Sequence, residues 1–341
     1  MPKRDIIGLG GSAGSTQALR LLLGELPADL KATIFITTHI PPSGSQYLAE
    51  VLRRTCALPV LVAAEGDEPL PGHIYLATPD GHFLVFGAKF RTGRGPRENM
   101  VRPSIDPMLR SLALTYGSRC IGIILSGSLN DGASGLCAIR QCGGLAVVQS
   151  PEDAAVPDMP LAAIEAAAPE HLAAASAIGA LLVALVETEA PAAKDCPTEL
   201  QVEVEIAAGA RLGSERLRAF ADPGVFSCPN CHGVLSEVRG SRPLRYRCQI
   251  GHGITSQVLD EIQKAKTEQA LRIALRVMEE RAALVDRMAK DARRAGRGSI
   301  AELYEARQRE YAGHAETLRK AVVAGLAPIV EDDPAPAGLA D

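Results

Sequence analysis

The chain contains no tryptophan, and aromatic residues make up only 4% of its 341 residues. This scarcity leaves few side chains that could stack on nucleobases or sugar rings, which argues against a platform for single-stranded nucleic acid or carbohydrate. The sequence also has no excess of positive charge, because its formal net charge is −4 at pH 7 and its Lys and Arg residues are spread out. Nucleic acid is therefore not an expected partner.

Long hydrophobic runs are also missing, since no apolar stretch approaches the roughly 18 residues that a membrane span requires. Residues 1–5 lack the apolar core of a signal peptide. We therefore expect a cytoplasmic protein that does not insert into membranes. Four cysteines scattered through apolar surroundings are typical of reduced core cysteines in such a compartment: Cys56, Cys120, Cys137 and Cys142.

Residues 5 to about 190 alternate short β-branched runs with amphipathic stretches, a pattern typical of parallel strands joined by helices. This predicts an α/β unit. A turn at Pro79–Gly81 predicts a hairpin and hence a mixed sheet. The expected strands are 5–9, 33–38, 60–63, 74–77, 83–86, 121–125 and 145–149. The expected helices are 16–24, 46–55, 107–116, 132–141 and 161–167.

The length of the whole chain, 341 residues, favours more than one domain, and the composition after residue 190 changes several times. Residues 200–206 are modestly strand-like within an otherwise polar stretch. Helical spacing returns near residue 256, and a break at Gly296–Gly298 predicts two antiparallel helices. The expected parts are an α/β domain (1–190), a linker (191–223), a cysteine-containing module (224–255), a helical hairpin (256–325) and a disordered tail (326–341).

The first expected strand breaks into Gly10-Gly11-Ser12-Ala13-Gly14, which places a serine in a GxSxG turn. Glycines on both sides permit a sharp strand-to-helix turn that presents the hydroxyl as a nucleophile. The same loop also fits the GxGxxA dinucleotide fingerprint that starts at Gly8. That fingerprint expects a carboxylate after the second strand, where this chain has His39, so the nucleophile interpretation is favoured.

Ser12 and His39 both follow the carboxyl ends of neighbouring expected strands, where sites form in open α/β sheets. An imidazole is the usual base for a serine nucleophile, although His39 could also be an ordinary loop histidine. Among Asp80, Asp106 and Asp131, only Asp131 directly follows a buried strand, so it is the expected third member unless it merely caps the next helix. The order Ser, His, Asp excludes an ordinary α/β-hydrolase.

Around these residues the sequence resembles the CheB-type catalytic domain of the chemotaxis protein-glutamate methylesterases. The likeness covers roughly residues 5–190 and rests on five motifs: IGLGGSAGS (7–15), THIPP (38–42), RPSID (102–106), LSGSLNDGA (125–133) and Asp158–Pro160. It implies a doubly wound, mostly parallel, Rossmann-like sheet and a Ser12–His39–Asp131 triad.

The resemblance also implies hydrolysis of glutamate γ-methyl esters on chemoreceptor or receptor-like proteins through an acyl-enzyme, without a catalytic cofactor. Deamidation of receptor glutamines is a related activity. Backbone donors at Ala13 and in the loop that contains Ser128 would hold the oxyanion. Arg102 would position an acidic receptor segment or, as an alternative, form a loop salt bridge.

The chain departs from the family pattern in two places. Family members usually have Thr-Gly-Met-Gly where this chain has Ser126-Gly127-Ser128-Leu129, and well-known members carry a receiver domain before the catalytic domain. Because this chain enters its first strand at residue 5, we expect no control by a receiver in cis. A separate regulatory protein is then a further expected partner, and the C-terminal region is expected to replace the receiver in targeting or regulation.

The remaining clustered cysteines form a CxxC pair, Cys228 and Cys231, followed by Cys248 and His252 in a CxxxH pair. Three thiolates and an imidazole complete a tetrahedral zinc site with no open position, so we predict structural rather than catalytic zinc. His232 is the weaker rival ligand, and coincidental cysteines or a redox pair are the alternatives. A hairpin within residues 234–246 would bring the two pairs together.

The sequence thus supports a methylesterase as the leading hypothesis. The alternative from another class is a catalytically weak or inactive signalling scaffold that binds partners through the C-terminal region. An esterase for another carboxyl ester also stays open, because the substrate-binding loops are not readable from sequence.

Overall fold

The computed structural model describes residues 2–39 and 44–326 of the chain, which divide into two compact units. The first unit extends to Leu259 and the second begins at Asp260. Pro41 and Pro42 of the second family motif lie outside the described residues, and so does the expected disordered tail beyond Leu326.

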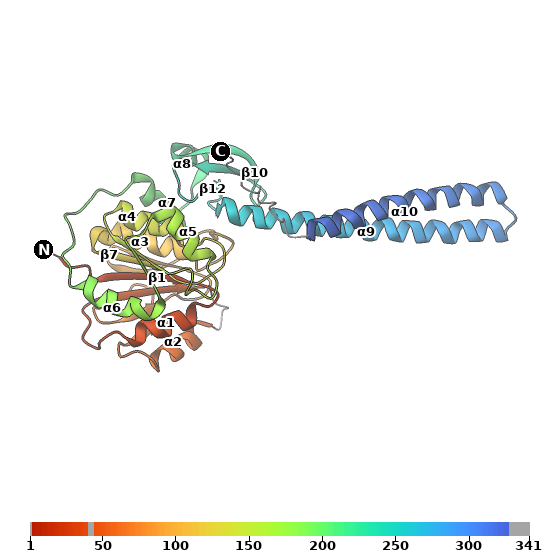
Figure 1. The fold of residues 1–341 in the computed structure, drawn as a ribbon. Coiled ribbons are helices and arrows are strands. Elements are labelled where there is room, and N and C mark those ends of the chain that lie inside the picture. Colours follow the sequence, from red (N-terminus) through yellow and green to blue (C-terminus); the bar gives the residue numbers. More distant parts are fainter. Residues whose placement is uncertain (1, 40–43, 327–341) are drawn as a thin grey trace, which may run out of the picture. The chain divides into compact units, whose positions relative to one another are not determined.

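A seven-stranded sheet forms the centre of the first unit, in the order β3-β4-β2-β1-β7-β8-β9 (Figure 1). All of its pairings are parallel, and the three central strands are buried along their whole length, as expected when helices cover both faces. The strands are β1 (Ile6–Gly11), β2 (Thr33–Thr38), β3 (Val60–Val62), β4 (Ile74–Leu76), β7 (Cys120–Ile124), β8 (Leu145–Gln149) and β9 (His171–Ala173).

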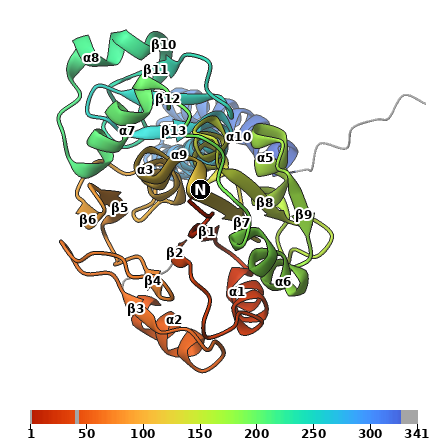
Figure 2. The ribbon, with the colours of Figure 1, turned by 90° about the vertical axis from the view of Figure 1, so that its left-hand side faces the viewer.

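Helices cover the two faces of this sheet, as Figures 1 and 2 show. One face packs on α1 (Ser15–Gly24), α2 (Gly44–Arg53) and α6 (Ala175–Val186), and the other on α3 (Ile105–Tyr116), α4 (Ala133–Gln141) and α5 (Asp158–Ala167). A short 3₁₀ turn, η1 (Gly117–Arg119), leads from α3 into β7. The predicted doubly wound, mostly parallel α/β fold is confirmed. The chain adds strands to both sides of β1, so the end of β1 is the switch point at which such folds form sites.

The predicted hairpin at Pro79–Gly81, and with it the mixed sheet, is wrong. Strand β4 pairs only with the parallel strands β2 and β3, while β5 (His82–Phe86) pairs with β6 (Lys89–Gly93) in a separate antiparallel ribbon. The hairpin turn lies at Gly87 and Ala88, whose φ angles of 56° and 63° suit a two-residue turn between antiparallel strands. Ala88 could not be recognised as a turn residue from the sequence, because alanine rarely adopts a positive φ.

The expected linker at 191–223 is also wrong, because it contains α7 (Thr198–Ala208) and α8 (Gly213–Phe220). The strand-like pattern at 200–206 belongs to α7, where Leu200, Val204 and Ala207 are buried at helical spacing. Glu203 on the same helix is 5% exposed and faces arginines of two other elements, which fixes this segment within the first unit.

A four-stranded antiparallel sheet follows α8, and we call residues 221–255 the ribbon. Its strands in order are β10 (Ala221–Ser227), β11 (Val234–Val238), β12 (Arg245–Cys248) and β13 (Gly253–Thr255). The antiparallel β11–β12 pair confirms the predicted hairpin within 234–246. The ribbon lies inside the first compact unit, so the expected boundaries at 190 and 224 do not separate compact parts.

Buried ion pairs join the ribbon, α7 and α3. The Arg247 guanidinium, on β12, donates through Nη2 to Glu98 Oε1 and to Glu203 Oε1, both at 3.0 Å. The Arg110 guanidinium on α3 donates through Nη1 to Glu98 Oε2 at 2.9 Å and lies 3.6 Å from Glu203 Oε2. All four side chains are buried, so each charge depends on the others for compensation.

Cys142 was expected to be a reduced core cysteine, and this is wrong. It forms a disulfide with Cys196, with a Cα–Cα distance of 4.8 Å, because the chain before α7 returns past the end of α4. Cys56, Cys120 and Cys137 are free, as predicted, and range from half-buried to buried.

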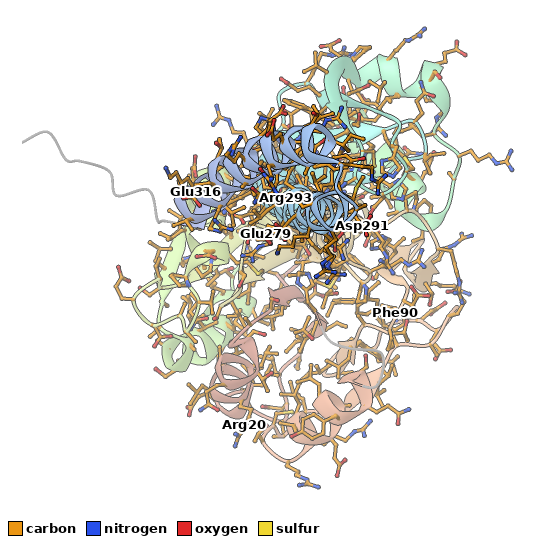
Figure 3. All side chains as sticks on the ribbon, turned by 90° about the vertical axis from the view of Figure 1, so that its right-hand side faces the viewer. Arg20, Phe90, Glu279, Asp291, Arg293 and Glu316 are labelled. Atoms are coloured by element: carbon orange, nitrogen blue, oxygen red, sulfur yellow. A yellow bond between two sulfur atoms is a disulfide. The ribbon has the colours of Figure 1, made fainter. Side chains whose placement is uncertain are left out.

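The second unit is an antiparallel helical pair, as predicted: it contains α9 (Ser256–Arg294) from Asp260 onward and α10 (Gly298–Leu326). Figure 3 labels several of the charged side chains along this pair. The guanidinium of Arg293 donates to Glu305 at 2.8 Å and that of Arg319 to Glu279 at 2.6 Å, which links the two helices at two separate positions. No helix within the described residues is long and apolar enough to cross a membrane.

Loss of Glu203 should destabilise the first unit strongly. In Glu203→Ala, the Arg110 and Arg247 guanidinium groups lose a buried counter-charge, so we expect the free energy of unfolding to fall by about 3–5 kcal/mol in urea denaturation. Glu205→Ala on the same helix removes only a partly exposed pair with Arg216 and should cost about 1 kcal/mol or less. Equal losses in the two variants would contradict the structural role assigned to Glu203.

Candidate active site

Ser12 stands between the end of β1 and the start of α1, as the GxSxG pattern predicts. Its amide donates to Ser126 O at 2.9 Å, and Ser15 Oγ donates back to Ser12 O at 2.7 Å, which fixes the turn. Gly14 has a φ of 79°, and a Cβ there would lie 2.7 Å from Ser126 Oγ. The turn therefore requires glycine at this position.

The structure brings Ser12, His39 and Asp131 into one hydrogen-bonded chain. His39 Nδ1 lies 3.2 Å from Ser12 Oγ, and His39 Nε2 lies 2.7 Å from Asp131 Oδ2. When Nε2 carries the proton that Asp131 accepts, Nδ1 is left to accept the proton of the serine hydroxyl. The predicted proximity of these residues is confirmed, and Asp131, rather than Asp80 or Asp106, faces the imidazole.

Asp131 is almost completely buried, yet its carboxylate is well supplied with donors. It accepts hydrogen bonds from the Ile105 amide at 2.7 Å, from Ser104 Oγ at 2.7 Å and from Asn99 Nδ2 at 3.1 Å. Burial opposes ionisation, but the bond to His39 and these donors keep the pKa of Asp131 well below its ordinary value. The carboxylate thus accepts a hydrogen bond from the start of α3. It does not cap α4, the helix that follows it in the chain, because the N-cap of α4 is Gly132 and has no side-chain hydrogen bond.

Asp106 lies behind Asp131 rather than on the histidine. Its carboxyl accepts from the Gly135 amide at 2.7 Å and from Asn99 Nδ2 at 3.3 Å, and the Arg110 guanidinium lies 3.6 Å away. Burial, together with the neighbouring charge of Asp131, raises the pKa of Asp106 to about 7. Its protonation state is therefore sensitive to pH near neutrality.

The loop 126–131 closes the other side of Ser12. The amides of Ser126, Gly127 and Leu129 donate to Gln149 Oε1, Val156 O and Asp158 Oδ2, respectively. Within residues 2–39 and 44–326, the Ser128 amide has no acceptor, and its residue is exposed. Ala13, the other predicted donor, directly precedes the N-cap of α1.

Gly127 explains why this loop can approach the serine so closely. A Cβ at Gly127 would lie 2.9 Å from the Cβ of Ser12 and would overlap the sulfur of Met159. The first glycine of the loop is therefore sterically required, whereas Leu129 adopts a φ of 63° without being glycine.

Arg102 does not reach the three residues of the hydrogen-bonded chain. Its guanidinium donates through Nη2 to Asp80 Oδ1 at 2.8 Å and through Nη1 to Gly95 O at 2.9 Å. This geometry favours a loop salt bridge for Arg102 over the positioning of substrate.

Sequence reasoning missed Asn99 and Ser104, which both donate to Asp131. Ser104 lies inside the RPSID motif, so the motif itself was a signal. Asn99 lies just before that motif and has a φ of 50°, a left-handed conformation that asparagine tolerates better than most residues. No periodicity or spacing marks it in the sequence.

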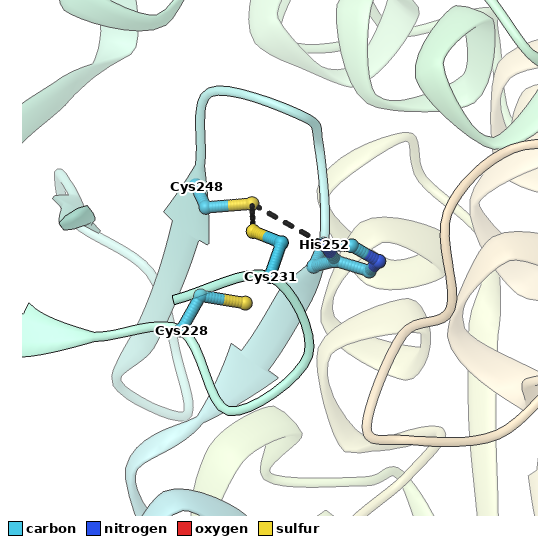
Figure 4. A group of neighbouring side chains, drawn as sticks. All are labelled: Cys228, Cys231, Cys248 and His252. Atoms are coloured by element: carbon cyan, nitrogen blue, oxygen red, sulfur yellow. Dashed lines mark hydrogen bonds between the residues drawn. The ribbon is translucent and has the colours of Figure 1, made fainter. Parts of the chain in front are cut away.

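The four predicted metal ligands gather in the ribbon, as Figure 4 shows. One ligand atom from each of Cys228, Cys231, Cys248 and His252 lies within 4.8 Å of all the others. Cys231 Sγ is 3.6 Å from Cys248 Sγ, which is 3.5 Å from His252 Nδ1. A tetrahedral zinc with Zn–S bonds of about 2.3 Å has edges of about 3.8 Å, so this donor set fits. His232 is not in this cluster.

Comparisons with known proteins match the same part of the chain. The family model described as CheB methylesterase matches residues 7–182. A protein-glutamate methylesterase/protein-glutamine glutaminase 1 from Xanthomonas campestris pv. campestris is 37% identical over 184 residues, which are 53% of this chain and 51% of that protein. A relative of the same description from Yersinia pestis bv. Antiqua is 37% identical over 168 residues, 48% of each chain.

The chain therefore spans about half the length of the curated relatives it matches. Among solved structures, the CheB methylesterase catalytic domain of Thermotoga maritima is 30% identical and superposes with a TM-score of 0.53. The match covers 55% of this chain and 100% of that domain. On the family match, together with the motifs and the fold that carry it, the chain belongs to the CheB methylesterase family.

Proposed function

We propose that this chain is a protein-glutamate methylesterase, a serine hydrolase that demethylates glutamate γ-methyl esters on chemoreceptor or receptor-like proteins. The observation that carries the proposal is the hydrogen-bonded chain from Ser12 Oγ through His39 to Asp131 at the switch point of the sheet. Membership in the CheB family, and relatives named as methylesterases and glutaminases, support this substrate class.

The proposed reaction is acyl transfer in two stages. His39 Nδ1 accepts the hydroxyl proton as Ser12 Oγ attacks the γ-carbonyl carbon of the ester. The tetrahedral intermediate then collapses: the C–O bond to the methoxy group breaks, and the His39 imidazolium gives its proton to the departing methoxide oxygen, which leaves as methanol. Water attacks the acyl-serine in the same way and releases the glutamate side chain. The ionised Asp131 stabilises the imidazolium in both stages, and no cofactor is needed.

The oxyanion of each intermediate needs donors that are free to reach it. We assign this role to the backbone amides of Ala13 and Ser128. The Ala13 amide lies at the positive end of the α1 dipole. The amides on either side of Ser128 already donate hydrogen bonds to other acceptors, which leaves the Ser128 amide for the oxyanion. Because these donors are backbone groups, the change from the usual family side chains in loop 126–131 leaves them available. Arg102 we assign to the loop pair with Asp80.

Deamidation of receptor glutamines fits the same site, because a γ-amide presents the same carbonyl and releases ammonia instead of methanol. Control of the enzyme by a separate regulatory protein stays a prediction. The helical pair α9–α10 would be a surface for such a partner.

The function is tested by Ser12→Ala. A fluorophosphonate should label Ser12 in the wild type, and the variant should lose both labelling and methanol release from a methylated receptor by at least about a thousandfold. Ser299→Ala, on α10, is the matched control and should behave like the wild type. Absence of labelling in the native wild-type protein would overturn the proposal in favour of a noncatalytic scaffold.

The stability of the protein should depend on pH through Asp106. Its pKa is raised from 3.8 to about 7 on folding, so the folded state holds this proton more tightly than the unfolded chain. That contribution to stability is complete at low pH and is lost as the pH rises through about 7.

We therefore expect Asp106→Asn to gain stability relative to the wild type as the pH rises from 5 to 8. The gain should be on the order of 1 kcal/mol per pH unit below the raised pKa, measured by urea denaturation at each pH. Asp222→Asn, at an exposed pair with Arg239, is the control. If the free energies of unfolding of Asp106→Asn and the wild type differ by the same amount at every pH from 5 to 8, Asp106 is ionised throughout this range and the prediction is wrong.

We further propose that the Cys/His cluster holds one structural zinc ion. The support is the complete set of four donors at tetrahedral spacing within a small sheet of the first unit. Such an ion would join the β10–β11 turn to the β12–β13 turn.

Metal analysis of the purified chain should find about one zinc per molecule, and Cys248→Ala should lose it. A chelator should lower the melting temperature of the wild type but not that of Cys248→Ala. Cys56→Ser, at a free cysteine outside the cluster, should keep both the metal and the chelator response. Metal-free protein in which Cys231 and Cys248 oxidise together would instead indicate the redox pair.

A further inference from the structure

Strand β13 of the ribbon is hydrogen-bonded to the loop around Asn99, which donates to Asp131 of the candidate active site. The Asn99 amide donates to Gly253 O at 2.9 Å, and Glu98 and Gly253 form an isolated parallel bridge. The Thr255 amide donates to Asn99 Oδ1 at 3.1 Å. Both the backbone and the side chain of Asn99 are therefore held by the ribbon.

The other end of the Asn99 side chain faces the site. Asn99 Nδ2 donates to Asp131 Oδ1 at 3.1 Å, while Asp131 Oδ2 accepts from His39. A single carboxamide thus spans from a ribbon strand to the carboxylate that orients the imidazole. Thr255 makes a second link, because its Oγ1 donates at 2.7 Å to Oδ1 of Asn130, the residue before Asp131.

The backbone at this junction needs support from its neighbours. Asn99 and Met100 have φ angles of 50° and 68°, so two consecutive non-glycine residues are left-handed. Such conformations persist only where the surroundings impose them. The surroundings here are β13 on one side and Asp131 with Asp106 on the other.

Arg247 ties the same loop to the metal cluster. Its guanidinium donates through Nη2 to Glu98 Oε1 at 3.0 Å and through Nη1 to Gly251 O at 2.7 Å. Gly251 precedes His252, and Glu98 precedes Asn99. The turn that carries the histidine ligand is therefore linked to the Asn99 loop both through Arg247 and through β13.

We propose that Asn99 is a positioning residue for Asp131 and that β13 holds Asn99 in place, so that order at the Cys228–Cys231–Cys248–His252 cluster is transmitted to the Ser12–His39–Asp131 site. This inference rests on the proposed hydrolase function. Metal binding would fix the β12–β13 turn, the turn would fix Gly253 and Thr255, and these would keep Asp131 Oδ2 on the imidazole. The ribbon is then part of the support of the active site.

The primary test is the rate at which a fluorophosphonate labels Ser12 in the full chain. Asn99→Ala and Thr255→Val should each slow labelling, by about ten- to a hundredfold for Asn99→Ala, because a displacement on the order of 1 Å at a catalytic group has that effect. Thr267→Val, on the exposed surface of α9, is the matched control for Thr255→Val and should label at the wild-type rate. Wild-type rates in both Asn99→Ala and Thr255→Val would overturn the inference.

A second arm tests the transmission itself. Zinc removal by a chelator should slow labelling of the wild type, and the effect should shrink in Asn99→Ala, because the connection to Asp131 is already broken there. If chelation slows both proteins by the same factor, the ribbon does not act through Asn99.

A readout independent of activity separates this inference from the proposed function. The low-field proton resonance of the His39 Nε2–Asp131 Oδ2 hydrogen bond should weaken in Asn99→Ala and after chelation, and return when zinc is restored to the wild type. Retention of that signal in a folded Asn99→Ala protein would contradict the inference even if Ser12 labels normally. If Ser12 is not labelled even in the wild type, but the resonance is present in the wild type and lost in Asn99→Ala, the positioning role of Asn99 is supported and only the hydrolase function is refuted.

Discussion

The buried carboxylate of Asp131 is the group on which the rest of this site depends. A charge removed from water must be compensated by nearby donors, and here they come from three separate parts of the chain. His39 follows β2, Ser104 and the Ile105 amide belong to the start of α3, and Asn99 lies in the loop that pairs with β13. Asp131 therefore keeps its full set of donors only while the parallel sheet, the start of α3 and the ribbon hold their positions relative to one another. The same requirement aligns His39 with Ser12.

A second layer of charge continues this arrangement away from the serine. Behind Asp131 lie Asp106 and Arg110, and behind them Glu98, Glu203 and Arg247. These side chains are buried, so the charges of Glu98, Arg110, Glu203 and Arg247 depend on one another for compensation, whereas burial and the charge of Asp131 raise the pKa of Asp106. A stretch with the composition of a linker is held in place as α7, because Glu203 on this helix lies against the guanidinium groups of Arg110, Arg245 and Arg247. The same ion pairs explain why the ribbon cannot be treated as a separate module.

Residues whose positions follow from local rules were predictable from the sequence. Ser12, His39 and Asp131 each follow a strand, and the carboxyl ends of parallel strands share one edge, so their meeting could be inferred without coordinates. The spacing of the cysteines and of His252 was enough to predict that Cys228, Cys231, Cys248 and His252 lie together. Asn99 could not be found in this way, because its partners Asp131 and Thr255 are 32 and 156 residues away and no local pattern connects them. Residues 200–206 were misread because their β-branched side chains suggested a strand, whereas in the structure they belong to α7 and Glu203 pairs with arginines that are distant in the sequence.

The boundary of the family match does not coincide with the boundary of the site. The matched segment ends at residue 182, whereas Glu203, Arg247 and Thr255 come later in the chain. If the chain were cut near residue 190, Glu98 would keep Arg110 but lose Arg247, and Arg110 would lose Glu203. Asn99 Oδ1 would lose its only donor among the described residues, and the left-handed Asn99–Met100 backbone would lose β13. These losses converge on the loop that donates to Asp131, so residues outside the segment shared with relatives make contacts that support Asp131 in this chain.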